Sequence, residues 1–385
     1  MSVEPEILKA TYLPGDVTED KAAAYFYGRL FAAEPRLRAL FPPAMDVSRD
    51  RLFRTLTVVV FRSDEPAELA GLLEPLGRAH RKYGVLPEHY PVFGDALVAT
   101  LRRFAGAAWS ARAEAAWTAA YARAAALMIA AAEADAAAGP PWWVAEVAEH
   151  DRRRPDLAVL TLVPDRPYPF AAGQHATVQT SRWPRVWRPY SLAGAPRPDG
   201  TLRLHVRSVP GGWVSGALVR ETRAGDTLLL GPPAGGLTLD PESGRDLLLL
   251  GGGTGLAPLK ALAEQAAADA PGRTVRLFAG ARSADDLYDL PDLRRLESAR
   301  PEVRVTAVPQ DEFGPLPDAL ADLLDAVPDP AGHDVYVAGP PAMVRGALDA
   351  LDRCGVPAGR VRHELAATGE TVLPGADRDR PVAHA

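Results

Sequence analysis

The sequence predicts a multidomain fold: an all-α domain, then an antiparallel β-barrel domain, then an α/β domain with a doubly wound parallel sheet. Three observations predict this order. Helix-period apolar spacing fills the first third of the chain, short strand patterns follow Gly139, and strand–helix alternation begins near Arg245. We therefore expect domains at residues 1–138, 139–243 and 244–368, with a disordered tail at residues 369–385.

Residues 1–138 are predicted to be helical. Apolar side chains recur there at spacings of three and four, as in Phe26 and Leu30, and prolines mark short connections. A long Ala-rich helix is expected at about Ala111–Ala138. Strict apolar–polar alternation does not occur in this part of the sequence, which excludes a sheet there.

The second domain begins where Gly139-Pro140-Pro141 ends the last helix. Short stretches of alternating apolar residues are then separated by turn signals such as Pro198-Asp199-Gly200. Strand spacing of this kind is typical of a small antiparallel barrel. The expected strands are Trp143–Glu149, Ala158–Pro164, His175–Thr180, Arg188–Ala193, Leu202–Ser208 and Thr227–Leu230.

The third domain is predicted from continuous apolar strands that alternate with helical stretches. The first strand, Leu247–Leu250, precedes a glycine-rich turn and a helix at Leu256–Ala268. Buried strands that alternate with helices indicate a parallel sheet covered on both faces. Further strands are expected at Val275–Ala279, Val303–Val308 and Val335–Val337.

Composition limits the partners of the protein. The chain has 385 residues, 47% of them hydrophobic and 24% charged, with a formal net charge of −6. Because the net charge is negative, we do not expect the protein to bind nucleic acid. The apolar stretches are too short to predict a helix that spans a membrane. The single cysteine, Cys354, excludes an intrachain disulfide. We expect a cytoplasmic monomer whose partners are small molecules.

The strongest local motif is Gly251–Pro258, which follows a buried strand and opens a helix. Gly252, Gly253, Thr254 and Gly255 let the backbone approach a pyrophosphate, and the helix N-terminus supplies free N–H groups. Pro258 lies in the first helical turn, where its missing N–H costs nothing. A glycine-rich turn without a ligand would show the same residues.

Two further turns have the residues of phosphate sites. Gly339 and Pro340 follow another sheet strand, so they are expected near the same carboxyl edge as the first motif. Gly212, Val214 and Ser215 belong to a turn that enters a short helix. Each turn has an ordinary alternative, a loop that starts a helix or a hairpin turn.

A flavin is suggested by Arg188-Pro189-Tyr190-Ser191. On a strand, Arg188 and Tyr190 point to one face and Ser191 to the other. A fixed cation can bind a pyrophosphate, and a tyrosine ring can lie against an isoalloxazine. An ordinary strand end with a surface arginine and a packed tyrosine is the alternative.

Together these motifs resemble the ferredoxin–NADP reductase-like superfamily. Arg188–Ser191, Gly212–Ser215, Gly252–Pro258 and Gly339–Pro340 occur in that superfamily's order and spacing. The resemblance implies FAD, with Arg188 and Ser215 near its phosphates and Tyr190 and Ser191 at the flavin ring. It also implies that NADH or NADPH binds at the last two motifs.

The helical domain holds two histidines, His80 and His89. His80 lies on the apolar face formed by Leu69, Leu73 and Leu76, where an imidazole can ligate a haem iron or simply belong to the core. Residues 79–94, 25–31 and 37–41 resemble the proximal, distal-tyrosine and haem-packing segments of flavohaemoglobins. That resemblance covers about residues 5 to 365, and it implies haem b.

Roles in the haem domain follow from this resemblance. It implies that His80 is the iron ligand, that Tyr90 hydrogen-bonds near it, and that Tyr27 donates to iron-bound dioxygen. It also implies that Phe41 packs on the porphyrin and that Leu52 closes the distal pocket.

The sequence departs from the flavohaemoglobin pattern in three places. Ser48 stands where the family has a distal Gln, so the distal network is expected to reduce to Tyr27. Counted from Trp117, the position of the family's proximal Glu falls at Ala132, with Glu133 beside it. Glu133 either faces His80 or is a solvated helix-end residue.

The third departure is near the C-terminus. Glu364 keeps the family's acidic position, but Ala366 replaces an aromatic residue that shields the flavin, so the nicotinamide is expected to reach the ring more freely. Arg282-Ser283 could hold the 2′-phosphate of NADPH or be part of a surface loop.

The function implied by the resemblance is nitric oxide dioxygenase. Electrons from NAD(P)H would pass through FAD to haem, where NO and O2 are converted to nitrate. Two alternatives stay open at this point. One is an NAD(P)H-dependent haem, oxygen or hydroperoxide reductase with weak dioxygenase activity. The other is an O2- or NO-binding globin that its own reductase keeps ferrous.

Overall fold

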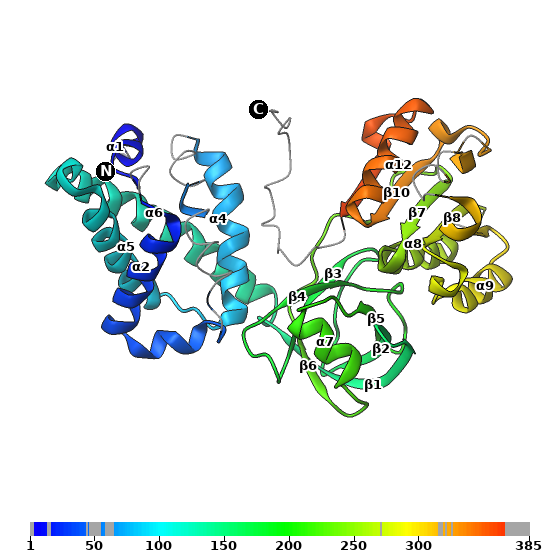
Figure 1. Ribbon diagram of the computed structural model, residues 1–385, viewed down its shortest axis with the longest axis horizontal. Coiled ribbons are helices and arrows are strands. Elements are labelled where there is room, and N and C mark those ends of the chain that lie inside the picture. Colours follow the sequence, from blue (N-terminus) through cyan, green and yellow to red (C-terminus); the bar gives the residue numbers. More distant parts are fainter. Residues whose placement is uncertain are drawn as a thin grey trace. The chain divides into compact units, whose positions relative to one another are not determined.

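The computed structural model describes residues 4–13, 17–43, 45, 55–57, 65–269, 272–314, 319, 322–324 and 326–365. The chain divides into two compact units after Pro141 (Figure 1). The first unit is helical, and the second holds two sheets. Each is described by itself below.

The helical unit is built on two packed pairs, α2 with α5 and α4 with α6. Its core contains Phe26, Leu30, Leu101 and Trp117, all nearly inaccessible to solvent. Its helices and 3-10 turns are α1 (Pro5–Ala10), α2 (Glu19–Ala33), η1 (Pro35–Leu40), α4 (Pro66–His80), η2 (Arg81–Tyr83), α5 (His89–Ala105), η3 (Gly106–Ala108) and α6 (Ala111–Ala138).

The Ala-rich helix α6 has the predicted bounds. By length and composition alone it could cross a bilayer. Its side chains contribute to the core of the helical unit instead, since Trp117, Ala125 and Met128 are buried there. At Ser110 the side chain accepts a hydrogen bond from the N–H of Ala113, which caps the helix N-terminus.

The first sheet of the second unit is an antiparallel barrel in the order β4-β3-β6-β1-β2-β5. A bridge between Leu192 and Leu204 brings its two ends together, so the barrel is nearly closed. Helix α7 (Trp213–Arg220) contributes Val214 and Leu218 to the barrel core. The strands are β1 (Trp143–Arg154), β2 (Leu157–Pro164), β3 (His175–Thr180), β4 (Arg188–Ser191), β5 (Leu202–Arg207) and β6 (Thr227–Leu230).

These strands match the prediction except at four ends. Strand β2 begins one residue earlier than predicted, at Leu157, and β5 ends one residue earlier, at Arg207. Strand β1 continues to Arg154, beyond the predicted end at Glu149, and β4 stops at Ser191. The extension was missed because residues 150–154 are polar or charged and carry no apolar alternation.

The second sheet is parallel, in the order β11-β10-β7-β8-β9. Apolar clusters cover both of its faces, so the predicted doubly wound sheet is confirmed. Its strands are β7 (Leu247–Gly252), β8 (Val275–Ala281), β9 (Val303–Pro309), β10 (Asp334–Gly339) and β11 (Val361–Leu365). The helices are α8 (Leu256–Asp269), α9 (Leu290–Ala299), α10 (Gln310–Phe313) and α12 (Pro341–Arg353), with the 3-10 turns η4 (Gly253–Gly255), η5 (Ala284–Asp286), η6 (Pro330–Gly332) and η7 (Ala358–Arg360).

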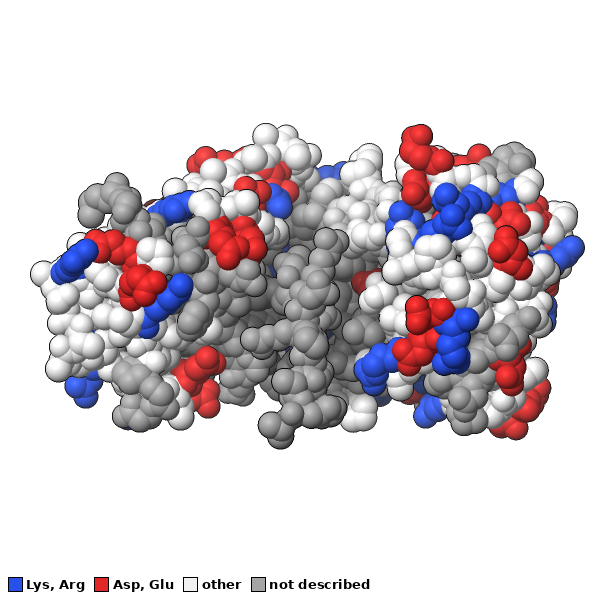
Figure 2. Space-filling model, turned by 90° about the horizontal axis from the view of Figure 1, so that it is seen from above, with Lys and Arg blue, Asp and Glu red and all other residues white. Residues whose placement is uncertain are grey.

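Strand β11 was not predicted. Among the described strands it pairs only with β10, so it is an edge strand, and its sequence Val361-Arg362-His363-Glu364-Leu365 lacks the apolar run of the central strands. Figure 2 shows that basic and acidic side chains are interspersed on the visible described surface of this second unit.

Candidate functional site

The proximal side of the predicted haem site is a hydrogen-bonded pair. His80 is the last residue of α4, and Tyr90 is the second residue of α5. The Nδ1 atom of His80 lies 3.3 Å from the Tyr90 hydroxyl. The connection turns sharply at Gly84, whose φ of 80° lies in the left-handed region that favours glycine. Two helix ends are thereby brought together.

Burial sets the protonation of this pair. It lowers the pKa of His80 to about 4 and raises the pKa of Tyr90 to about 12. The imidazole is therefore neutral at pH 7, which is the form that ligates iron. Since Nδ1 is engaged by Tyr90, Nε2 is the nitrogen left to bind a metal. His80 and Tyr90 thus fit a haem ligand and its orienting partner.

Helix α6 buttresses Tyr90 from behind. The Tyr121 hydroxyl donates to the Tyr90 carbonyl oxygen at 2.8 Å. Tyr121 packs against both the cluster that contains Tyr90 and the one that contains Tyr27. It therefore connects the proximal and distal sides of the helical core.

Glu133 does not join the His80–Tyr90 pair. Met128 packs on the α4 side of α6, and Glu133 lies about 140° around the helix from it. Its side chain is exposed. The nearby acid that forms an ion pair is Asp135, with Arg81. The predicted contact of Glu133 with His80 is therefore wrong for this structure, and the solvated alternative holds.

The predicted distal residues lie in an aromatic cluster. Tyr27 is buried, stacks on Phe31 with ring centroids 5.8 Å apart, and meets Phe41 edge-on at 5.4 Å. Phe41 is half-buried and also stacks on Phe93. Leu52 and Ser48 lie outside the described residues. The roles of Tyr27 and Phe41 stay predictions.

The flavin motif forms β4 as predicted, and its residues alternate between the two faces. Tyr190 pairs in register with Ala176 and packs against the barrel core, whereas Ser191 pairs with His175 on the other face. Burial raises the pKa of Tyr190, with the Arg188 cation acting in the opposite direction. Arg188 donates to the Trp187 carbonyl oxygen at 2.9 Å.

The second flavin motif is the turn into α7, at Gly212. A Cβ on this residue would collide with Ser215 Oγ and stand 2.6 Å from Val209 Cγ2, so both side chains would have to move to admit a larger residue. The Ser215 hydroxyl donates to the Gly212 carbonyl oxygen and accepts from the Val209 N–H, both at 3.3 Å. Val214 points into the barrel core, so its side chain is not available to a ligand. Its backbone N–H at the helix N-terminus is what the turn can offer to a phosphate.

The two nicotinamide motifs meet at one edge of the parallel sheet. Gly252 ends β7, Gly253, Thr254 and Gly255 form η4, and Pro258 is buried in the first turn of α8. A Cβ on Gly255 would collide with the Ala338 carbonyl. Gly339 and Pro340 follow directly, at the end of the neighbouring strand β10. The predicted common edge is confirmed, and it fits a pyrophosphate.

Glu364 lies on β11 at this same edge. It is opposite Ala338 in register, and its Oε1 lies 3.6 Å from the Nδ1 atom of His175 on β3. Burial raises the pKa of Glu364. Glu364 thus lies beside a strand of the flavin barrel, and its role in cofactor binding stays a prediction. Ala366 lies outside the described residues.

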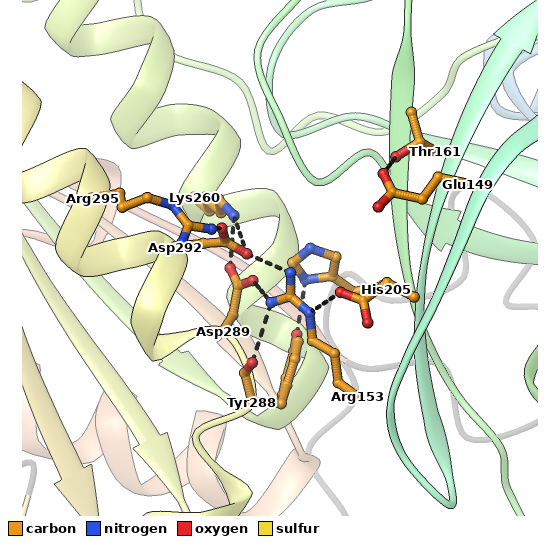
Figure 3. Close-up of polar contacts among 10 residues, drawn as sticks. Glu149, Arg153, Thr161, His205, Lys260, Tyr288, Asp289, Asp292 and Arg295 are labelled. Carbon is orange, nitrogen blue, oxygen red and sulfur yellow. Dashed lines mark hydrogen bonds and ion pairs between the residues drawn. The ribbon is translucent and has the colours of Figure 1, made fainter.

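The structure also places a buried charge cluster between the barrel and the parallel-sheet domain (Figure 3). Arg153 of β1 binds Asp289 and Asp292, each at 2.5 Å, and Lys260 of α8 binds Asp289 at 2.8 Å. Beside them His205 Nδ1 lies 2.9 Å from the Tyr288 hydroxyl. One feature of the sequence indicates this cluster: Lys260 lies in an otherwise apolar stretch of α8.

Arg282 and Ser283 follow β8, near the predicted adenosine site. Arg282 is exposed, and its Nε lies 3.4 Å from Asp286. Asp286 also pairs with Arg154 at 3.1 Å.

Comparisons with known proteins agree with this domain order. Residues 24–128 match the Globin family, residues 146–238 the oxidoreductase FAD-binding domain, and residues 249–349 the oxidoreductase NAD-binding domain. The chain is 30% identical to Flavohemoprotein of Bordetella pertussis, over 95% of this chain and 99% of that protein. It is also 30% identical to Flavohemoprotein of Deinococcus radiodurans, over 96% and 97% of the two chains.

A solved structure supports the same fold. The flavohemoglobin of Malassezia yamatoensis, determined with bound FAD and heme, aligns with a TM-score of 0.71 at 19% identity and covers 94% of this chain and 96% of that one. The predicted family, fold and set of cofactors are confirmed by these matches. The chain therefore belongs to the flavohemoprotein family, whose members are oxidoreductases that join a haem globin to FAD- and NAD-binding domains.

Proposed function

We propose that this flavohemoprotein is a nitric oxide dioxygenase, which uses electrons from NADH or NADPH to convert NO and O2 to nitrate. The observation that carries the proposal is the contact between His80 Nδ1 and the Tyr90 hydroxyl. It fixes a neutral imidazole at the end of α4 with Nε2 left to ligate iron. Haem, when bound, supplies the iron centre at which NO and O2 react, and FAD supplies single electrons from a hydride.

Tyr27 supports the proposal on the distal side. Its ring is buried among Phe31 and Phe41, so burial removes competing water around its hydroxyl. A phenol in such a place is suited to donate a hydrogen bond to a bound oxygen ligand.

The reductase unit supports the electron supply. Its flavin strand β4 lies on the same barrel sheet as His175, which contacts Glu364 at the dinucleotide edge. Hydride donor and acceptor are therefore expected to meet between β4 and the Gly252–Pro258 turn.

Anaerobic reduction by NADH or NADPH, followed by stopped-flow mixing with O2 and NO, tests the proposal. NO consumption driven by NADH should fall to background in His80→Ala. His89→Ala is the matched control, because His89 belongs to the same segment but accepts a turn hydrogen bond from the Leu86 N–H. NO consumption by His80→Ala equal to that of the unchanged protein would refute the proposal.

A second candidate is favoured by the exposed Glu133. A proximal histidine without a carboxylate partner is less basic and donates less electron density to iron. The chain would then act chiefly as an NAD(P)H-dependent reductase of oxygen or hydroperoxides. In the stopped-flow experiment this candidate predicts fast O2 or hydroperoxide consumption that NO does not accelerate. An O2- or NO-binding globin predicts ligand binding without turnover.

A further inference from the structure

His175 is the first residue of strand β3 in the flavin barrel. Its neighbours Ala176 and Val178 are fully buried in the barrel core, so His175 lies on the outer face of β3. In the antiparallel register it stands directly opposite Ser191, the last residue of the flavin motif. Residues opposite one another in such a pair share a face and contact each other.

The backbone of His175 is held firmly. Its N–H donates to the Ala234 carbonyl oxygen, and its own carbonyl accepts from the Ala234 N–H, both at 2.9 Å. Gly235 follows with a φ of 104°, and a Cβ there would stand only 2.9 Å from His175 Nδ1. The chain therefore leaves room for the imidazole at this point by placing glycine beside it.

Glu364 reaches the same point from the parallel sheet. On β11 it pairs in register with Ala338, which pairs in turn with Gly251 of β7. Glu364, Ala338 and Gly251 are therefore aligned across three neighbouring strands, and β7 and β10 are the two that end in the dinucleotide turns. Its Oε1 atom is 3.6 Å from His175 Nδ1.

We propose that His175 is a positioning residue of the hydride-transfer junction: its imidazole holds the Glu364 carboxylate beside Ser191, between the flavin strand and the dinucleotide edge. A glutamate has several rotatable bonds, and fixing its rotamer in advance removes an entropic cost from each turnover. The 3.6 Å separation is slightly longer than a hydrogen bond. Contacts of this kind are often long before ligands bind and shorten in the complex.

This inference rests on the FAD- and NAD-dependent oxidoreductase activity and not on NO chemistry. It concerns the reduction of flavin by nucleotide, which can be measured anaerobically by flavin absorbance in a His80→Ala background without haem. Failure of the dioxygenase proposal would leave this measurement unchanged.

The kinetic test compares His175→Ala, His175→Asn and Glu364→Gln in that background. His175→Ala should slow hydride transfer about 5- to 10-fold, the cost of ordering one long side chain. FAD content and the Kd of NADH should stay unchanged. His175→Asn, whose amide can replace Nδ1 as a donor, should retain most of the rate. The double variant His175→Ala/Glu364→Gln should be no slower than Glu364→Gln alone, because His175 acts through Glu364.

The structural test uses the full-length protein with its FAD and does not depend on activity. The ring nitrogens of His175 are followed by NMR, and Glu364→Gln should move the titration midpoint of this imidazole by about 0.5 or more. Glu149→Gln is the control, since Glu149 lies on β1 and contacts Thr161. If the His175→Ala variant loses FAD, its rate of hydride transfer cannot be compared. The rate of His175→Asn and the NMR titration then test the inference.

Two results would overturn the inference. The first is a rate of hydride transfer in His175→Ala equal to that of the unchanged protein. A double variant that is slower than Glu364→Gln alone by the same factor as His175→Ala would count equally against it, because the two residues would then act independently. The other is an imidazole whose titration midpoint ignores Glu364→Gln.

Discussion

Arg153 and Asp289 form an ion pair, with Nη1 2.5 Å from Oδ1, between the β1–β2 hairpin of the flavin barrel and the start of α9 in the parallel-sheet domain. Asp289 is completely buried and also binds Lys260 of α8, the helix that begins at the dinucleotide turn. One carboxylate thus connects the barrel, α8 and α9. The flavin and dinucleotide halves of the reductase are held together through it (Figure 3).

Asp289→Ala should strongly destabilise the reductase unit. It removes one of the two carboxylates that Arg153 and the buried Lys260 share, and leaves Asp292 as the other. Removing a partner from a buried ion pair costs about 3–5 kcal/mol. Release of FAD in guanidinium chloride, followed by flavin fluorescence, measures this. The matched control is Asp285→Ala, because Asp285 is exposed and precedes the same helix. Equal midpoints for the two variants would contradict the role of the cluster.

Tyr90→Phe should loosen haem while leaving the fold intact. The Phe ring fills the same volume, but the hydrogen bond to His80 Nδ1 is lost, and such partners of a metal ligand change affinity about 10- to 100-fold. Transfer of haem to an acceptor apoprotein measures the rate of loss. Tyr25→Phe is the control, since Tyr25 packs edge-on to Phe104. The same rate of haem loss in both variants would argue against the pair.

The haem-free globin unit should lose stability as pH falls from about 6.5 to about 4. Burial lowers the pKa of His80 from 6.5 to about 4, so in this window the unfolded chain binds a proton that the folded chain does not. Unfolding takes up that proton, and acid therefore favours it. Urea midpoints measured by circular dichroism at 222 nm across this range should fall more steeply for the unchanged protein than for His80→Leu. Urea midpoints that fall equally with pH in both proteins would show that His80 does not cause the loss of stability in acid.

Glu133→Gln should change NO consumption less than twofold. The side chain is exposed and lies on another face of α6 from Met128, so removal of its charge is screened by solvent. The stopped-flow assay measures this, with Tyr90→Phe as the comparison that should respond. A tenfold loss in Glu133→Gln would mean that the carboxylate reaches His80 when the cofactor is bound.

Local signals made much of this molecule predictable. Strand β7, the glycine turn at Gly252–Gly255 and helix α8 are contiguous in sequence, so apolar runs and glycines were enough to find them. The His80–Tyr90 contact spans ten residues and came from a resemblance to a known family. The periodicity of apolar residues does not predict that these two side chains meet.

Long-range partners were not predictable from local patterns. His175 and Glu364 are separated by most of the reductase unit, and Arg153 and Asp289 by 136 positions. No spacing rule connects such residues, because sheet order and domain packing decide which of them meet. Glu133 was misplaced for a related reason, since one residue of helix register moves a side chain by about 100°.

Gly255→Ala should abolish nucleotide binding while FAD stays bound. The added Cβ would collide with the Ala338 carbonyl and the Gly339 Cα atom, so the dinucleotide turn must separate from the end of β10. Backbone atoms on both sides leave no flexible side chain to absorb the clash. Titration of the oxidised protein with NAD+ or NADP+, followed by flavin absorbance, measures binding.

Gly236→Ala is the control for that substitution, because a Cβ there meets no atom of the described residues within 4 Å. It should bind both FAD and nucleotide like the unchanged protein. If Gly255→Ala binds nucleotide normally, the close approach of η4 to the end of β10 is not what shapes the site. If it loses FAD as well, the change has spread beyond the dinucleotide turn into the barrel.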